Sequence, residues 1–91
     1  MMETLEVGQV VFSKCGRDQG RAFIVISLEE EYAYLADGDL RLLENPKRKK
    51  NKHIQRTNEV IHKLKQNLIE ENVSDADIRK ALKAYLIKTS I

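Results

Sequence analysis

The sequence has few of the residues that cross-link, kink or anchor a chain. Of its 91 residues one is cysteine, one is proline and none is tryptophan. The single thiol, Cys15, has no partner for an internal disulfide, which is typical of a reducing compartment. No apolar run approaches the roughly 20 residues that cross a bilayer. Glu3 and Glu6 stand where a signal peptide has its basic and apolar regions. We therefore expect a soluble, cytoplasmic protein with no membrane partner.

Residue patterns that indicate catalysis or metal binding are also missing. A zinc site needs about four clustered nitrogen or sulfur ligands, and Cys15, His53 and His62 do not provide them. Cys15 with either histidine could be read as a nucleophile and its base, but a chain of this length contains one thiol and two histidines by chance. The segment GRDQG (16–20) lacks the pattern of a phosphate-binding loop of nucleotide enzymes. We therefore expect no enzyme, no metal and no cofactor.

Positive charge, in contrast, is concentrated in the middle of the chain. Residues 1–40 hold three basic and eight acidic residues, residues 41–65 hold nine and two, and residues 66–91 hold four of each. The densest run is KRKKNK (47–52), directly after Pro46. Such asymmetry favours a polyanionic partner, nucleic acid more often than membrane. A solvated linker is the alternative interpretation of this run.

The first half of the chain predicts short strands. Residues 7–13, 21–28, 32–37 and 39–44 are rich in β-branched, aromatic or alternating apolar residues. Gly16 and Gly20 bound a loop between the first two, and Asp37-Gly38 is a two-residue hairpin signal between the last two. Several short strands at this spacing indicate a small barrel or sandwich. Pro46 is expected to end the last strand.

The second half predicts two amphipathic helices. Apolar residues from Val60 to Ile69 recur at spacings of three and four, and Thr57 or Asn58 is a candidate N-cap. After a break at 72–73, Ser74 and Asp77 have the spacing of a capping box at the start of a second helix. We expect the two helices to pack on each other, on the strands or on a partner. The expected division is 1–56 for the strands with the basic run and 57–91 for the helices.

Aromatic residues are few, and two of them have an open role. Phe12 and Phe23 lie in apolar runs and are expected in the core, and Tyr85 fits the apolar stripe of the last helix. Tyr32 and Tyr34 share one face of a predicted strand. They are candidates either for packing or for stacking on bases.

The segment VGQVVFSKCGRDQGRAFIVI (7–26) resembles the KOW motif, with Gly8, Val10 and a loop that ends at Gly20 before an apolar strand. Together with DGDLRLLENPKRKKNKHI (37–54), it looks like the fourteenth large-subunit ribosomal protein of archaea and eukaryotes and like small bacterial KOW-domain RNA-binding proteins. The resemblance covers about residues 6–56. It implies a mainly β fold with α, a small SH3-like β-barrel, here followed by a two-helix segment. It also implies RNA binding, and the basic run independently favours the same function.

The hypothesis from sequence is therefore a non-enzymatic, ribosome-associated protein that binds structured ribosomal RNA, with ribosomal proteins as further partners, and that is monomeric when free. Phosphate contacts are expected from the glycine-bounded loop and from the basic run, with His53 either contacting RNA or packing the end of the run. The candidate residues are Lys14, Arg17, Arg21, Lys47, Arg48, Lys49, Lys50, Lys52 and His53. The alternative is a protein-interaction adaptor, for example a transcription or translation factor that contacts RNA polymerase or a ribosomal protein.

Overall fold

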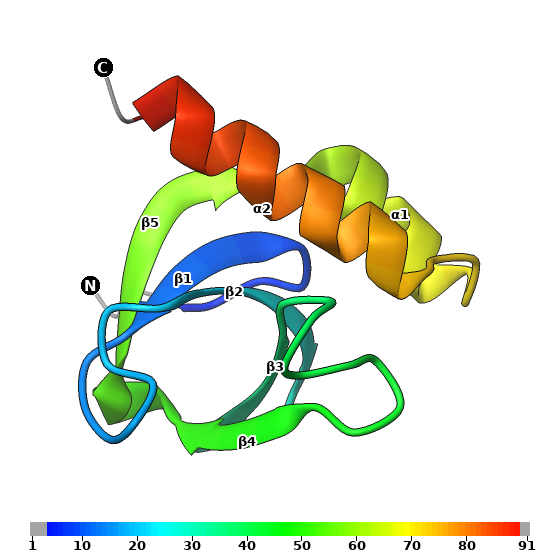
Figure 1. Ribbon diagram of the computed structural model, residues 1–91. Coiled ribbons are helices and arrows are strands. Elements are labelled where there is room, and N and C mark those ends of the chain that lie inside the picture. Colours follow the sequence, from blue (N-terminus) through cyan, green and yellow to red (C-terminus); the bar gives the residue numbers. More distant parts are fainter. Residues whose placement is uncertain (1–3, 90–91) are drawn as a thin grey trace.

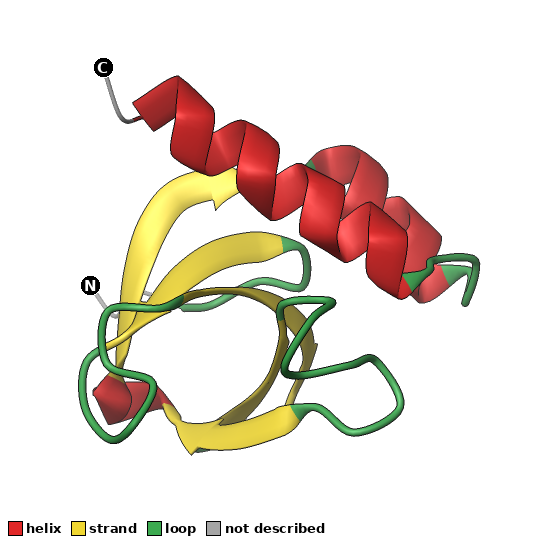
Figure 2. Cartoon of the chain, in the orientation of Figure 1, coloured by secondary structure: helices red, strands yellow, loops and turns green. Residues whose placement is uncertain are grey.

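The computed structural model describes residues 4–89, which form five strands, a short 3₁₀-helix and two α-helices (Figures 1 and 2). In chain order the elements are β1 (Gln9–Ser13), β2 (Ala22–Leu28), β3 (Tyr32–Ala36), β4 (Lys47–Lys50), η1 (Asn51–His53), β5 (Ile54–Val60), α1 (His62–Ile69) and α2 (Asp75–Thr89).

The strands form one antiparallel sheet in the order β4-β3-β2-β1-β5. The two edge strands, β4 and β5, follow each other in the chain and are joined by η1, so the sheet curves until its two ends approach one another (Figure 1). The predicted class, mainly β with α, is thus confirmed as a five-stranded antiparallel sheet with two C-terminal helices.

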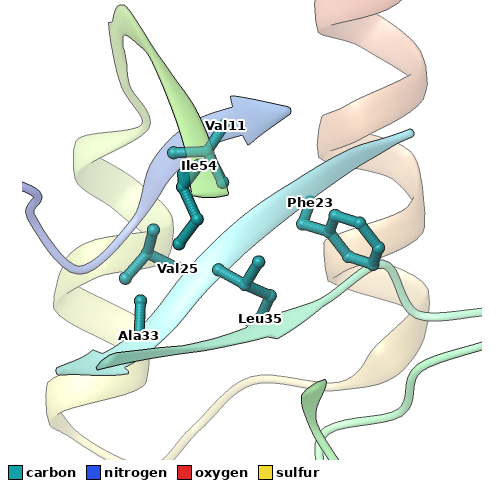
Figure 3. Packing of buried hydrophobic residues seen from close by; sticks show 6 residues of the cluster. All are labelled: Val11, Phe23, Val25, Ala33, Leu35 and Ile54. Carbon is teal, nitrogen blue, oxygen red and sulfur yellow. The ribbon is translucent and has the colours of Figure 1, made fainter. Parts of the chain in front are cut away.

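The inner face of the curved sheet carries one apolar core (Figure 3). Side chains on a strand alternate between the two faces of a sheet, and this core takes every second residue from neighbouring strands. Its members are Val11, Phe23, Val25, Ala33, Leu35 and Ile54. Phe23 is buried as expected, whereas Phe12, on the alternate position, is only half-buried.

The outer face carries a second core, which the helices cover. Val10 and Ile24 point outward and pack with Leu64 of α1 and with Ile78 and Leu82 of α2. Both helices therefore bury their apolar stripe against the sheet and against each other. These are two of the three arrangements that the sequence left open. Within residues 4–89, no helix is both long and apolar enough to cross a membrane.

The expected strand at 39–44 is wrong, and so is the hairpin turn at Asp37-Gly38. Residues 37–46 form a long loop instead, and Pro46 precedes a strand rather than ending one. Residues 47–50 of the basic run form the strand β4 in its place, which pairs with the side of β3 that β2 leaves open, in the register Tyr32↔Lys50 and Leu35↔Lys47.

The expected helix start at Thr57 or Asn58 is also wrong, because β5 continues to Val60. The Thr57 hydroxyl donates to the Val10 carbonyl oxygen at 2.7 Å, and the Gln9 side-chain amide donates to the Thr57 carbonyl oxygen at 2.8 Å. These bonds lie where the register between the two strands shifts, with the extra residues on β5 between Arg56 and Val60. The expected domain boundary at residue 56 falls inside this strand.

The start of α2 agrees with the prediction. The Ser74 hydroxyl accepts from the Asp77 backbone N–H at 3.2 Å, and the Asp77 carboxylate accepts from the Ser74 N–H at 3.0 Å. This reciprocal pair is a capping box, which satisfies two backbone donors at the start of the helix.

The first turn of α2 also holds the 37–46 loop in place. Arg79 Nη1 donates to the Gly38 carbonyl oxygen at 2.6 Å, and the Leu43 N–H donates to Asp75 Oδ1 at 2.8 Å. Gly38 has a φ of +77°, and a Cβ atom there would collide with the Asp75 carbonyl oxygen. Glycine is therefore required for both the backbone conformation and the close approach.

Replacing Gly38 with alanine should lower the free energy of unfolding by about 3 kcal/mol. A left-handed backbone costs about 1 kcal/mol for a residue with a Cβ, and overpacking adds roughly 1–3 kcal/mol. Gly20→Ala is the matched control, because its φ is +85° but, apart from Gly20 itself and its two chain neighbours, no heavy atom of residues 4–89 lies within 4 Å of the added Cβ. It should lose only the conformational part, about 1 kcal/mol. Urea unfolding measures both, and equal losses would contradict the packing of the loop on α2.

Candidate nucleic-acid interface

The candidate residues fall on three parts of the structure. Lys14, Arg17 and Arg21 belong to the loop between β1 and β2, Lys47, Arg48, Lys49 and Lys50 form β4, and Lys52 and His53 lie in η1. The basic run is therefore not an extension after the last strand, as the sequence suggested: its first four residues are an edge strand of the sheet, and its last two begin η1.

Strand alternation divides β4 into two faces with different surroundings. Lys47 and Lys49 lie on the inner face, opposite Leu35 and Ala33 of the apolar core, whereas Arg48 and Lys50 lie on the outer face. Inward-pointing charges and lysines on an edge strand also protect it from pairing with another chain. The four basic residues consequently do not form one uniform cationic surface.

The inner lysines are held by Asp18 of the glycine-bounded loop. Lys49 Nζ lies 3.1 Å from Asp18 Oδ1 and donates to the Cys15 carbonyl oxygen at 3.0 Å, and Lys47 Nζ lies 3.4 Å from Asp18 Oδ2. The Ser13 hydroxyl donates to Asp18 Oδ1 at 2.7 Å. Because only 9% of the Lys49 side chain is exposed, its ammonium serves this internal network. Its contact with RNA stays a prediction, which its burial disfavours.

The network keeps Asp18 ionised far below neutral pH. Burial tends to raise the pKa of Asp18, but the hydrogen bonds from Ser13 and Lys49 and the charges of Lys49 and Lys47 outweigh it. The pKa falls from 3.8 to about 2. The Asp18 side chain is 13% exposed, so solvent screens these interactions only in part.

A hollow of about 220 Å³ beside this network brings cations from three segments together. Four of its lining residues are basic: Arg17 and Arg21 from the glycine-bounded loop, Arg41 from the 37–46 loop, and Lys47 from β4. Two lining residues, Asp18 and Asp37, are acidic. The basic side chains thus outnumber the acidic ones around a concave surface.

Asp37 shapes the far wall of this hollow. Its Oδ1 accepts from the backbone N–H groups of Asp39 and Arg41 at 2.9 and 2.8 Å, and its Oδ2 accepts from Arg21 Nη2 at 3.0 Å. One carboxylate therefore fixes the turn that presents Arg41 and orients Arg21 toward the same space. Asp37 was expected only as a turn residue, and it also has this second role.

Arg41 was not among the candidates from the sequence. The segment 39–44 was interpreted as a strand, in which Arg41 would be one polar residue of an alternating pattern. The signal that could have found it is its place within the basic block 41–65, together with Asp37 four residues earlier.

Three further candidates lie away from this hollow. Lys14 and Lys52 are exposed, and the Lys14 N–H donates to the carbonyl oxygen of the half-buried His53 at 2.9 Å. Lys52 lies near Glu30 and Glu31, which line a second hollow with it. The structure therefore joins Arg17, Arg21 and Lys47 at one place and leaves Lys14, Lys52 and His53 apart from it.

Residues 4–89 contain no group of three or more His, Cys, Asp or Glu side chains placed to hold a metal ion. The half-buried Cys15 contributes its backbone carbonyl oxygen to the Asp18 network rather than its thiol.

No protein-family model matches the chain, and no curated protein matches it. The resemblance to KOW-domain proteins stays a prediction from the sequence.

The Asp18 network predicts a specific pH dependence of stability. Because the folded-state pKa lies below the ordinary value of 3.8, ionised Asp18 stabilises the fold above about pH 4, and this contribution is lost as the pH falls toward 2. Asp18→Asn should therefore cost about 2 kcal/mol of unfolding free energy at pH 6 and converge with the wild type near pH 2.

Urea unfolding between pH 6 and pH 2 measures this difference. Asp39→Asn, which removes an exposed carboxylate from the neighbouring loop, is the matched control and should lie close to the wild type at both pH values. A difference for Asp18→Asn that stays constant down to pH 2 would contradict the ion-pair network.

Proposed function

We propose that this chain is a non-enzymatic RNA-binding protein that binds the phosphate backbone of structured RNA, ribosomal RNA in particular, in the hollow between the glycine-bounded loop and the 37–46 loop. The observation that carries the proposal is the convergence of Arg17, Arg21, Arg41 and Lys47 on one concave surface. Three of these side chains are guanidinium groups, whose fixed fork of donors matches phosphate geometry.

The acidic residues around the hollow hold two of its cationic side chains in place. Asp18 and Asp37 already neutralise part of the cationic charge, so the site is organised before a ligand arrives, while Arg17 stays exposed. Phosphate contacts fix register without reading bases. Specificity would then come from the shape of the RNA or from unpaired bases.

The fold that we propose for this function is an SH3-like barrel of the KOW type. Three features support it: the strand order with η1 between β4 and β5, the glycine-bounded loop after β1, and the backbone hydrogen bond from Lys14 to His53, which continues the pairing of β1 with β5 into η1. A cytoplasmic, ribosome-associated protein that is monomeric when free, with ribosomal proteins nearby, is part of the same proposal.

The second candidate is a protein-interaction adaptor, for example one that contacts RNA polymerase or a ribosomal protein. It is favoured by a groove between the sheet and α2, which Phe12, Leu82, Leu86 and Ile87 line. Leu86 and Ile87 are 43% and 59% exposed. A pull-down with and without nuclease separates the two candidates, because an adaptor keeps its partner after the RNA is digested.

Removing two arginines from the hollow should weaken RNA binding and its salt dependence. For Arg17→Gln with Arg41→Gln, filter binding to an RNA stem-loop at several salt concentrations should show lower affinity. The slope of log K against log [salt] should become shallower by about 1.5, because two phosphate contacts are lost.

Lys63→Gln with Lys80→Gln is the matched control, since it removes the same charge from exposed positions on α1 and α2. Its salt slope should stay close to that of the wild type. If both pairs change affinity and slope equally, net charge rather than the hollow determines binding, and the proposed site is wrong.

A further inference from the structure

We propose that the outer face of β3 and β4 is a second RNA site, at which an unpaired base stacks on the guanidinium plane of Arg48. The inference rests on the proposed function, and it adds a preference for single-stranded, base-exposing RNA. It uses a face of the sheet that the phosphate hollow does not include.

The pairing of β3 with β4 places two aromatic and two basic side chains together. Tyr32 lies opposite Lys50, and Tyr34 lies opposite Arg48. All four positions belong to the outer face, since Ala33, Leu35 and the two inner lysines occupy the alternate positions.

Arg48 is held over the Tyr32 ring on this face without a ligand. Its Cζ lies 3.6 Å from the centroid of the Tyr32 ring, and its Nε lies 3.4 Å from Glu29 Oε1. The same Glu29 oxygen accepts from the Tyr34 hydroxyl at 2.6 Å. Tyr32 thus covers one side of the guanidinium and Glu29 fixes its rotation, while 52% of the Arg48 side chain stays exposed.

A planar, pre-oriented cation with an exposed face suits a base better than a phosphate. The hydrogen bond from Tyr34, followed by the contact with Arg48, lowers the pKa of Glu29, so this carboxylate is ionised at neutral pH and repels a phosphate placed beside it. A nucleobase has no such charge, and unpaired bases stack on aromatic rings and guanidinium planes. Bases inside a duplex do not offer their faces, so the site selects single strands, loops or bulges.

Lys50 completes the site. It is exposed, it lies opposite Tyr32 in the strand register, and its Nζ is 6.0 Å from the Tyr32 centroid. From there its ammonium can neutralise the phosphate of the nucleotide whose base stacks on Arg48.

The test compares two ligands of equal charge, a short single-stranded oligoadenylate and an abasic ribose-phosphate oligomer of the same length. The wild type should bind oligoadenylate about tenfold more tightly, as expected for one stacked base. Arg48→Lys keeps the charge but removes the plane, so it should lose most of that preference and bind the abasic oligomer within about twofold of the wild type. Circular dichroism checks that the variant is folded.

Arg17→Lys is the matched control, because it makes the same change in the phosphate hollow and should affect both ligands equally. Equal binding of the two ligands by the wild type, or an equal loss for both in Arg48→Lys, would overturn the stacking site and leave the phosphate-binding proposal standing. If the wild type binds neither oligomer nor the stem-loop, both proposals are wrong.

Discussion

The ion pairs of Asp18 with Lys47 and Lys49 are the constraint on which the candidate site depends. One carboxylate ties the glycine-bounded loop after β1 to the edge strand β4, which β3 and β2 separate from β1 in the sheet order. Without Asp18, the lysines at the core-facing positions of β4 would place unpaired charges beside Ala33 and Leu35. With it, the lysine stems cover the core while their ammoniums are paired.

This constraint explains how one short basic run has two roles. Its inner lysines hold the loop that presents Arg17 and Arg21, and its outer residues, Arg48 and Lys50, face the tyrosines of β3. The C-terminal helices contribute from the other side, since the first turn of α2 fixes the loop that carries Arg41. The proposed RNA-binding surface is thus assembled from loops that the core and the helices both position.

The sequence predicted those elements whose signals are local. The apolar runs of β2 and β3 and the Ser74–Asp77 capping box formed where they were expected. The prediction from sequence failed where contacts between residues far apart in the chain determine the local structure. Four consecutive basic residues have weak strand propensity, and β4 forms because β3 and Asp18 are there to pair with it. The segment 57–60 matches a helical period, but the bonds joining Thr57 to Gln9 and Val10 extend it as a strand. Arg41 was missed because apolar and polar residues alternate along its loop, as they do along a strand.

The central claim is that RNA contacts the arginines around the hollow while Lys49 stays inside the protein. An NMR titration of the ¹⁵N-labelled protein with an RNA stem-loop tests it most directly, with the Nε–Hε signals of the arginines and the backbone amides followed together. The account predicts saturable shifts for Arg17, Arg21 and Arg41 and for the 37–46 loop, with little change in α1 and α2. Shifts concentrated on the helices, with these arginine signals unmoved, would contradict it.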